Sequence, residues 1–202
     1  MNNKEIIENI IIKKDKKLVI FDFDGVIGKL NIDWIKSRKT AKELLKKNYN
    51  FMIEEDLRLD QIEYLVNEKF GEDILKDILK IREQFEEQGI HNSDINKDVV
   101  QLITDLNKIG TTLTVCSNNL SITIETFLRL FKLEKFFKCI VGVDNAIAPK
   151  PSIKGCEQIL HKYPIDKKQI LFIGDQRDID EEVAKKMNID YINRDRFNDF
   201  NY

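Results

Sequence analysis

The sequence has little of what several common kinds of protein depend on. Its three cysteines, Cys116, Cys139 and Cys156, are odd in number, widely spaced and without a Cys-x-x-Cys pair. A disulfide framework and zinc or thiol redox chemistry are therefore not indicated, and a reducing, intracellular setting is the simplest expectation. Only two histidines, His91 and His161, are present, which leaves little room for a histidine metal site or Ser-His-Asp catalysis. Carboxylates must carry most of any chemistry.

Long apolar runs and an excess of one charge are also missing. Near the start the longest apolar run is residues 10–12, which is too short for a signal-peptide core, and no run approaches a membrane span. The formal net charge is -2, so no global field draws the chain to nucleic acid or to an anionic membrane. We expect a cytoplasmic protein with neither of these partners. The sequence leaves the oligomeric state open.

The order of patterns along the chain predicts one core with an insertion. Residues 1–17 are polar and Lys-rich, which is typical of an N-terminal extension or a short packed helix. Residues 18–21 form an apolar run, as in a strand buried on both faces. Between residues 33 and 88 there is no proline and only one glycine, Gly71, and helical spacing predicts three helices. We expect a helical cap over residues 29–95 and a core over 18–28 and 96–202.

Helix and strand patterns alternate after the insertion. Such alternation predicts βαβ units and an α/β fold, a Rossmann-like doubly wound and mainly parallel sheet with a small α-helical cap inserted after the first strand. The expected helices are residues 98–109, 122–131, 152–163 and 180–187, and the expected strands are 112–116, 140–143, 170–173 and a last one near Tyr191.

Polar side chains follow four of the expected strands. In open α/β sheets ligands bind outside the carboxyl ends of the strands, so residues far apart in the sequence are expected to converge there. Their types suit one chemistry, with acids for a hard cation, a hydroxyl and a lysine for phosphoryl oxygens, and a carboxylate that can attack phosphorus. They are Asp22, Asp24, Ser117, Asn118, Lys150 and Asp175.

Four ordered motifs resemble those of the haloacid dehalogenase (HAD) superfamily. The sequence FDFDGV at residues 21–26 is similar to its first motif and VCSN at 115–118 to its second. The pair KP at 150–151 is similar to the third motif and GDQRDID at 174–180 to the fourth. The helical insertion lies where that superfamily places its helical cap, so the chain looks like a HAD hydrolase of the phosphoglycolate phosphatase type.

The resemblance implies a Mg²⁺-dependent phosphomonoesterase that acts on a small phosphorylated metabolite. Asp22 would be the nucleophile that forms an aspartyl phosphate, and Asp24 the general acid and base. Lys150 would neutralise charge on the phosphoryl group, with Lys154 as a competitor for this role. Asp22, the backbone carbonyl of Asp24, and Asp175 would hold the metal.

The remaining motif residues have more than one interpretation. The backbone of Gly25, the Ser117 hydroxyl and the backbone of Asn118 would bind the phosphoryl group, but Gly25 also suits a plain turn and the Ser-Asn pair suits a helix cap. The fourth motif usually carries a further acid that supports the metal. Asp180 fits its longer spacing, and Asp178 is the alternative.

Two other functions remain open at this point. A phosphosugar mutase of the same superfamily would use the same two aspartates, and a non-catalytic module would be phosphorylated on Asp22 without turnover. The acid at position 24 favours phosphate esters, because the dehalogenases and phosphonate hydrolases of the superfamily lack it. A basic stretch at Lys36, Arg38, Lys39 and Lys42 could face an anionic substrate, although such runs are more often solvated.

Overall fold

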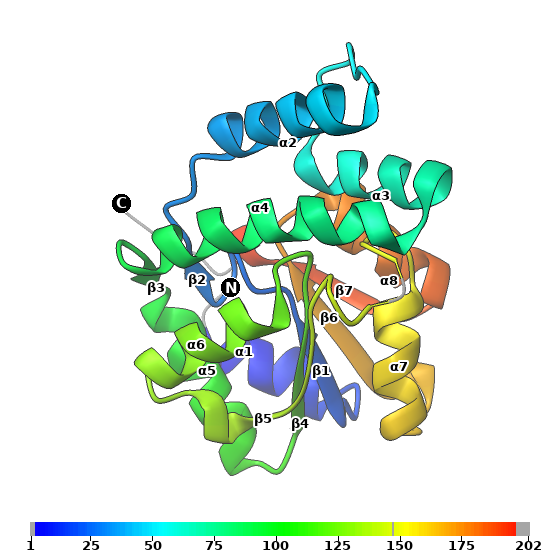
Figure 1. The fold of residues 1–202 in the computed structure, drawn as a ribbon. Helices are drawn as coiled ribbons and strands as arrows, with labels where there is room; N and C mark the ends of the chain where they lie inside the picture. Colours follow the sequence, from blue (N-terminus) through cyan, green and yellow to red (C-terminus); the bar gives the residue numbers. More distant parts are fainter. Residues whose placement is uncertain (1–2, 147, 197–202) are drawn as a thin grey trace. The chain divides into compact units, whose positions relative to one another are not determined.

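A computed structural model describes residues 3–146 and 148–196 of the chain (Figure 1). The chain divides into two compact units, one formed by Met1–Lys29 with Asp94–Tyr202 and the other by Leu30–Ser93. We call them the core unit and the helical unit and describe each by itself.

The core unit contains a parallel five-stranded sheet in the order β5-β4-β1-β6-β7. The chain runs outward from the central strand β1 through β4 to β5 and then crosses back to β6 and β7. This reversal beside β1 is the switch point at which open α/β sheets bind ligands. The strands are β1 Leu18–Phe21, β4 Thr112–Cys116, β5 Phe137–Val141, β6 Ile170–Gly174 and β7 Asp190–Asn193.

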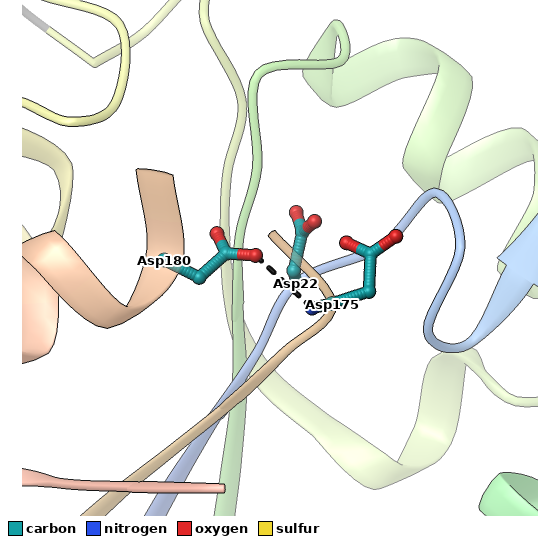
Figure 2. Close-up of side chains that lie close together, drawn as sticks. All are labelled: Asp22, Asp175 and Asp180. Carbon is teal, nitrogen blue, oxygen red and sulfur yellow. Dashed lines mark hydrogen bonds between the residues drawn. The ribbon is translucent and has the colours of Figure 1, made fainter. Parts of the chain in front are cut away.

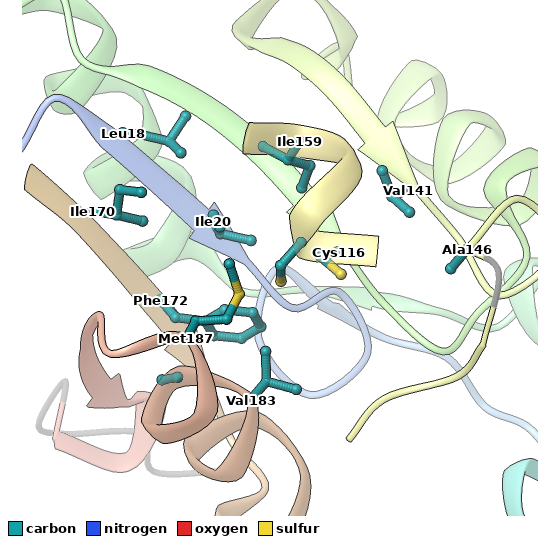
Figure 3. Packing of buried hydrophobic residues seen from close by; sticks show 12 residues of the cluster. Leu18, Ile20, Cys116, Val141, Ala146, Ile159, Ile170, Phe172, Val183 and Met187 are labelled. Carbon is teal, nitrogen blue, oxygen red and sulfur yellow. The ribbon is translucent and has the colours of Figure 1, made fainter. Parts of the chain in front are cut away.

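Helices cover both faces of this sheet (Figure 1). On one face, α7 (Lys154–Lys162) and α8 (Glu182–Met187) pack on side chains of β1 and β6, including Ile20 and Phe172 (Figure 3). The opposite face is covered by α5 (Lys97–Lys108) and α6 (Ser121–Leu130). The predicted doubly wound, mainly parallel α/β fold is confirmed.

The apolar run at residues 18–21 becomes β1 because both of its faces are covered. Leu18 pairs with Thr112 on one side and Ile170 on the other, and all four side chains of the strand are fully buried. Burying each such side chain contributes about 1.5–3 kcal/mol. This favours the centre of the sheet for the most apolar strand, and it fixes the position of the residues that follow Phe21.

The structure corrects the strand predicted over residues 140–143. β5 begins at Phe137, which is buried and pairs with Leu113 of β4. It ends at Val141, because the Val143 N–H donates to the Asn119 carbonyl at 2.9 Å and so leaves the ladder. β5 is an edge strand with mixed burial, so its apolar pattern was a weak guide to its limits.

The segment preceding β1 is helical and is packed on the core unit. Helix α1 (Asn3–Ile6) continues into a π-helical turn, Ile7–Ile12, and Ile6 and Ile11 are buried. Lys16 is also buried, and its Nζ donates to the carbonyls of Lys168 at 2.5 Å and Ile170 at 3.1 Å. Residues 3–12 are therefore helical and pack through Ile6 and Ile11.

A two-stranded antiparallel sheet marks the point where the chain leaves the core unit and returns to it. Strand β2 (Gly28–Lys29) pairs with β3 (Asp94–Ile95). Each strand has only two residues, which is too short for a sequence pattern, and neither was predicted.

The helical unit contains three helices around its own apolar core. They are α2 (Trp34–Tyr49), α3 (Leu59–Phe70) and α4 (Glu72–Ile90). The Asp33 side chain caps α2 by accepting from the Lys36 N–H at 2.9 Å. In the described part of the chain, no helix is long and apolar enough to cross a membrane. The core consists of Ala41, Leu45, Ile53, Leu59, Ile62, Val66, Ile78, Ile81 and Phe85.

Candidate active site

Three carboxylates gather at the carboxyl edge of the parallel sheet (Figure 2). Asp22 follows β1, and its N–H donates to the Ile173 carbonyl of β6 at 2.8 Å, so the ladder extends one residue past the strand. Asp175 follows β6, the neighbouring strand, and Asp180 comes from the turn after it. One oxygen atom from each of these three residues lies within 4.8 Å of the others.

Lys150 reaches this cluster from the loop after β5. Its Nζ lies 2.8 Å from Asp22 Oδ1 and 2.6 Å from Asp180 Oδ1, and its side chain is 4% exposed. Burial alone would lower the pKa of Lys150, but the charges of Asp180 and Asp22 outweigh it and hold the pKa above its ordinary value. Lys154 is exposed and pairs with Glu157, so the structure brings Lys150 and not Lys154 to the site.

The structure also separates the two alternatives for the further acid. Asp180 is buried, and its Oδ2 accepts from the N–H groups of Asp175 and Gln176, each at 3.1 Å. Burial raises the pKa of Asp180, and the Lys150 ammonium opposes this. Asp178 is exposed. The longer spacing is accommodated by a π-helical turn, Arg177–Glu181, which returns Asp180 toward the cluster.

One carboxylate oxygen in the cluster is left for a cation. Asp175 Oδ1 is buried and accepts no hydrogen bond from the described residues, whereas Asp22 Oδ1 lies 2.8 Å from Lys150 Nζ. Buried acceptors without donors are costly, and hard oxygen ligands suit Mg²⁺. The Asp22 and Asp175 side chains therefore fit the predicted metal. Asp24 is half-buried, and its side chain is not part of the three-carboxylate cluster.

Gly25 lets its loop pass very close to Asp175. Its φ is +85°, and a Cβ atom at this position would lie 2.3 Å from Asp175 Oδ2, so both backbone conformation and space require glycine. The Gly25 N–H donates to the Gly28 carbonyl at 2.7 Å. The structure thus gives this amide a hydrogen-bond partner inside its own loop.

Ser117 and Asn118 follow β4 but do not cap the next helix. Ser117 is buried, and its hydroxyl donates to Asn119 Oδ1 at 3.2 Å. The Asn118 side chain bonds to the backbone of Lys150. The N-terminus of α6 is instead satisfied by Asp144, which accepts from the Ser121 N–H at 2.6 Å. These roles of Asn119 and Asp144 were not predicted.

The pKa of Asp175 gives a prediction for the metal-free protein. Burial, followed by the charges of Asp22 and Asp180, raises its pKa from 3.8 to about 7. Between these two values the folded protein holds a proton that the unfolded chain has released, so stability falls as the pH rises through this window. In a chelator at about pH 8, Asp175→Asn should therefore melt several degrees above wild type, with the gap closing toward about pH 4. Thermal melts at both pH values test this, and a variant no more stable than wild type at the higher pH would contradict it.

The sheet topology and the acids, hydroxyl and lysine at its carboxyl edge define a Rossmann-like α/β enzyme. The family model described as haloacid dehalogenase-like hydrolase matches residues 19–193, and the chain belongs to this family. The family expected from the four motifs is thereby confirmed.

Several solved structures share the fold. A provisionally named phosphatase from Clostridium difficile is 25% identical, with a TM-score of 0.56 over 88% of this chain and 84% of its own. A HAD hydrolase of Bacillus subtilis crystallised with magnesium is 21% identical, with a TM-score of 0.55 over 87% and 85%. A Haemophilus somnus protein named as a phosphoglycolate phosphatase is 18% identical, with a TM-score of 0.59 over 88% and 84%. A search of curated proteins found no match.

Proposed function

We propose that this protein is a Mg²⁺-dependent phosphatase that hydrolyses a small phosphorylated metabolite through an aspartyl phosphate on Asp22. The observation that carries the proposal is the buried Asp22 carboxylate, which is paired with Lys150 beside the unbonded Asp175 oxygen. Relatives of the same fold named as phosphatases support it. The sequence predicts that residues 29–95 form a cap. We assign the selection of the substrate to these residues.

The Asp22 and Asp175 side chains and the backbone carbonyl of Asp24 would hold Mg²⁺. When bound, the ion would offset the negative charge of the two carboxylates and of the phosphoryl group. Asp180 would support this arrangement indirectly. Its two oxygens already accept hydrogen bonds from Lys150 Nζ and from the backbone N–H groups of Asp175 and Gln176.

In the first half of the reaction, an Asp22 oxygen attacks phosphorus in line with the ester oxygen. The bond from phosphorus to the leaving oxygen breaks, and Asp24 donates a proton to that oxygen. The Lys150 ammonium stabilises the charge on the phosphoryl oxygens, and the Ser117 hydroxyl exchanges its bond to Asn119 Oδ1 for one to a phosphoryl oxygen.

In the second half, Asp24 acts as a base. Its carboxylate takes a proton from a water molecule, whose oxygen attacks phosphorus, and the bond from phosphorus to Asp22 breaks. Inorganic phosphate leaves, and both aspartates return to their starting states. This use of Asp24 in both directions explains why an acid is needed two residues after the nucleophile.

A phosphate-release assay tests the proposal. With p-nitrophenyl phosphate and a panel of phosphorylated metabolites, including phosphoglycolate, we expect turnover in Mg²⁺ that falls at least about 100-fold in EDTA and returns when Mg²⁺ is added back. Absence of turnover across the panel, or turnover that EDTA leaves unchanged, would contradict it. Interconversion of sugar phosphate isomers faster than phosphate release would indicate the mutase instead.

A further inference from the structure

The Asn118 side chain is bonded at both of its ends to one peptide segment. Its Oδ1 accepts from the Lys150 N–H at 2.7 Å, and its Nδ2 donates to the Lys150 carbonyl at 3.0 Å. The two residues are 32 positions apart in the chain, so this pair of bonds ties the loop after β4 to the loop that carries Lys150. A primary amide is suited to this because it offers a donor and an acceptor side by side.

The sequence around Lys150 makes these two bonds unusually important. Two of the three prolines in the chain, Pro149 and Pro151, flank Lys150. Proline has no backbone N–H, so Lys150 supplies the one amide donor of this tripeptide. Asn118 accepts that donor, and it also binds the carbonyl of the same residue. The backbone of Lys150 is thus held at the base of a side chain whose Nζ must lie between Asp22 and Asp180.

The neighbouring amide has a different task. Asn119 accepts from the Ser117 hydroxyl and orients it, whereas the Asn118 side chain is engaged with the Lys150 backbone through both of its polar atoms. The two asparagines of the Ser-Asn-Asn sequence therefore contact different groups assigned to the phosphoryl site, Lys150 and the Ser117 hydroxyl. Asn118 serves the lysine and Asn119 serves the hydroxyl.

We infer that Asn118 is a positioning residue that acts on phosphoryl transfer only through Lys150, an inference that rests on the proposed function. We call these two hydrogen bonds of Asn118 the clamp. Without the clamp, the Lys150 loop loses these bonds to the loop after β4, and the ammonium shifts relative to Asp22. Displacements of about 1 Å in such groups can lower rates by about 100-fold.

A double-mutant cycle with p-nitrophenyl phosphate tests this inference. Asn118→Ala should lower kcat by about 10- to 100-fold, with KM changed less than about threefold. In a Lys150→Met background, the same substitution should change kcat by less than about twofold, because the group it positions is gone. An equal loss in both backgrounds would overturn the inference and would indicate that Asn118 acts on the substrate directly. Asn145→Ala, which also removes one loop hydrogen bond, to the Gly142 N–H, is the matched control and should leave kcat unchanged.

Amide hydrogen exchange tests the clamp without a measurement of turnover. It also does not require Lys150→Met to fold. The Lys150 N–H should be protected in wild type and in Asn145→Ala, and should exchange at least about tenfold faster in Asn118→Ala. Unchanged protection would overturn the clamp even in an active enzyme. If Asn118→Ala loses this protection but the wild-type protein has no phosphatase activity, the clamp stands and only the proposed function is contradicted.

Discussion

Replacing Asp22 by asparagine is expected to lower kcat/KM for phosphate release by at least about 10⁴-fold, as losses of catalytic nucleophiles do. The amide has nearly the same shape as the carboxylate, but it cannot attack phosphorus and offers a weaker ligand to Mg²⁺. Lys150 keeps its second partner, Asp180, at 2.6 Å, so the buried ammonium stays paired and the fold should persist. Steady-state kinetics together with a thermal melt separate lost chemistry from lost structure.

The matched control for this substitution is Asp98→Asn, which removes an exposed carboxylate from the first turn of α5 in the same unit. It should leave kcat/KM within about twofold of wild type, because it touches none of the clustered side chains. Turnover by Asp22→Asn within about tenfold of wild type would contradict the role of Asp22 as nucleophile. Acid quenching during turnover should also trap phosphate on wild type and not on the variant.

Convergence of the site could be predicted because it follows from the topology. In a parallel sheet the carboxyl ends of neighbouring strands share one edge, and β1 lies between β4 and β6. Asp22 and Asp175 each come directly after one of these strands, so little besides strand order was needed to bring them together. The apolar runs that define β1 and β6 are buried on both faces, and such strands give the clearest sequence pattern.

The order of the strands could not decide between neighbouring candidates for the further acid. Asp178 and Asp180 differ by two positions, and only the π-helical turn decides that Asp180 returns to the cluster. The role of the Asn118 side chain was hidden for a similar reason. A hydrogen bond across 32 residues leaves no periodic pattern, and the sequence suggested only a phosphoryl contact from the backbone of this residue or a helix cap.

Helical spacing predicts apolar positions and is silent about buried charge. In the helical unit, Arg82 of α4 is 3% exposed and lies between Glu63 of α3 and Glu86 of α4. Its Nε and Nη2 donate to Glu63 at 2.6 and 2.8 Å, and its Nη1 donates to Glu86 at 3.1 Å. The guanidinium also lies 5.4 Å from the centre of the Trp34 ring. Nothing in the spacing of the apolar residues indicated this cluster.

Loss of solvation on burial is the largest free-energy cost in this cluster of charges. It raises the pKa of Glu63 even though the Arg82 charge opposes it. Burial alone would lower the pKa of Arg82, but the carboxylates of Glu63 and Glu86 outweigh it and hold the pKa above its ordinary value. The three charges therefore depend on one another, and removal of one leaves the others desolvated and unmatched.

Arg82→Met is accordingly expected to destabilise the helical unit by about 3–5 kcal/mol, the usual cost of breaking a buried ion pair. For a chain of this length, that corresponds to a fall of roughly 6–20 °C in the melting temperature. Melts followed by circular dichroism measure the fall. Hydrogen exchange in α3 and α4 should show that the loss is greatest in this unit, because all three charges lie there.

Two further variants decide whether charge or packing is responsible. The triple variant Arg82→Met, Glu63→Leu, Glu86→Leu should recover most of the loss, because apolar residues of similar volume remove the unmatched charges. Arg38→Met removes the partner of the exposed Asp56, 3.7 Å away, and should cost less than about 1 kcal/mol. If the triple variant were as unstable as Arg82→Met alone, the packing of the arginine stem against Trp34, and not the buried charge, would account for the effect.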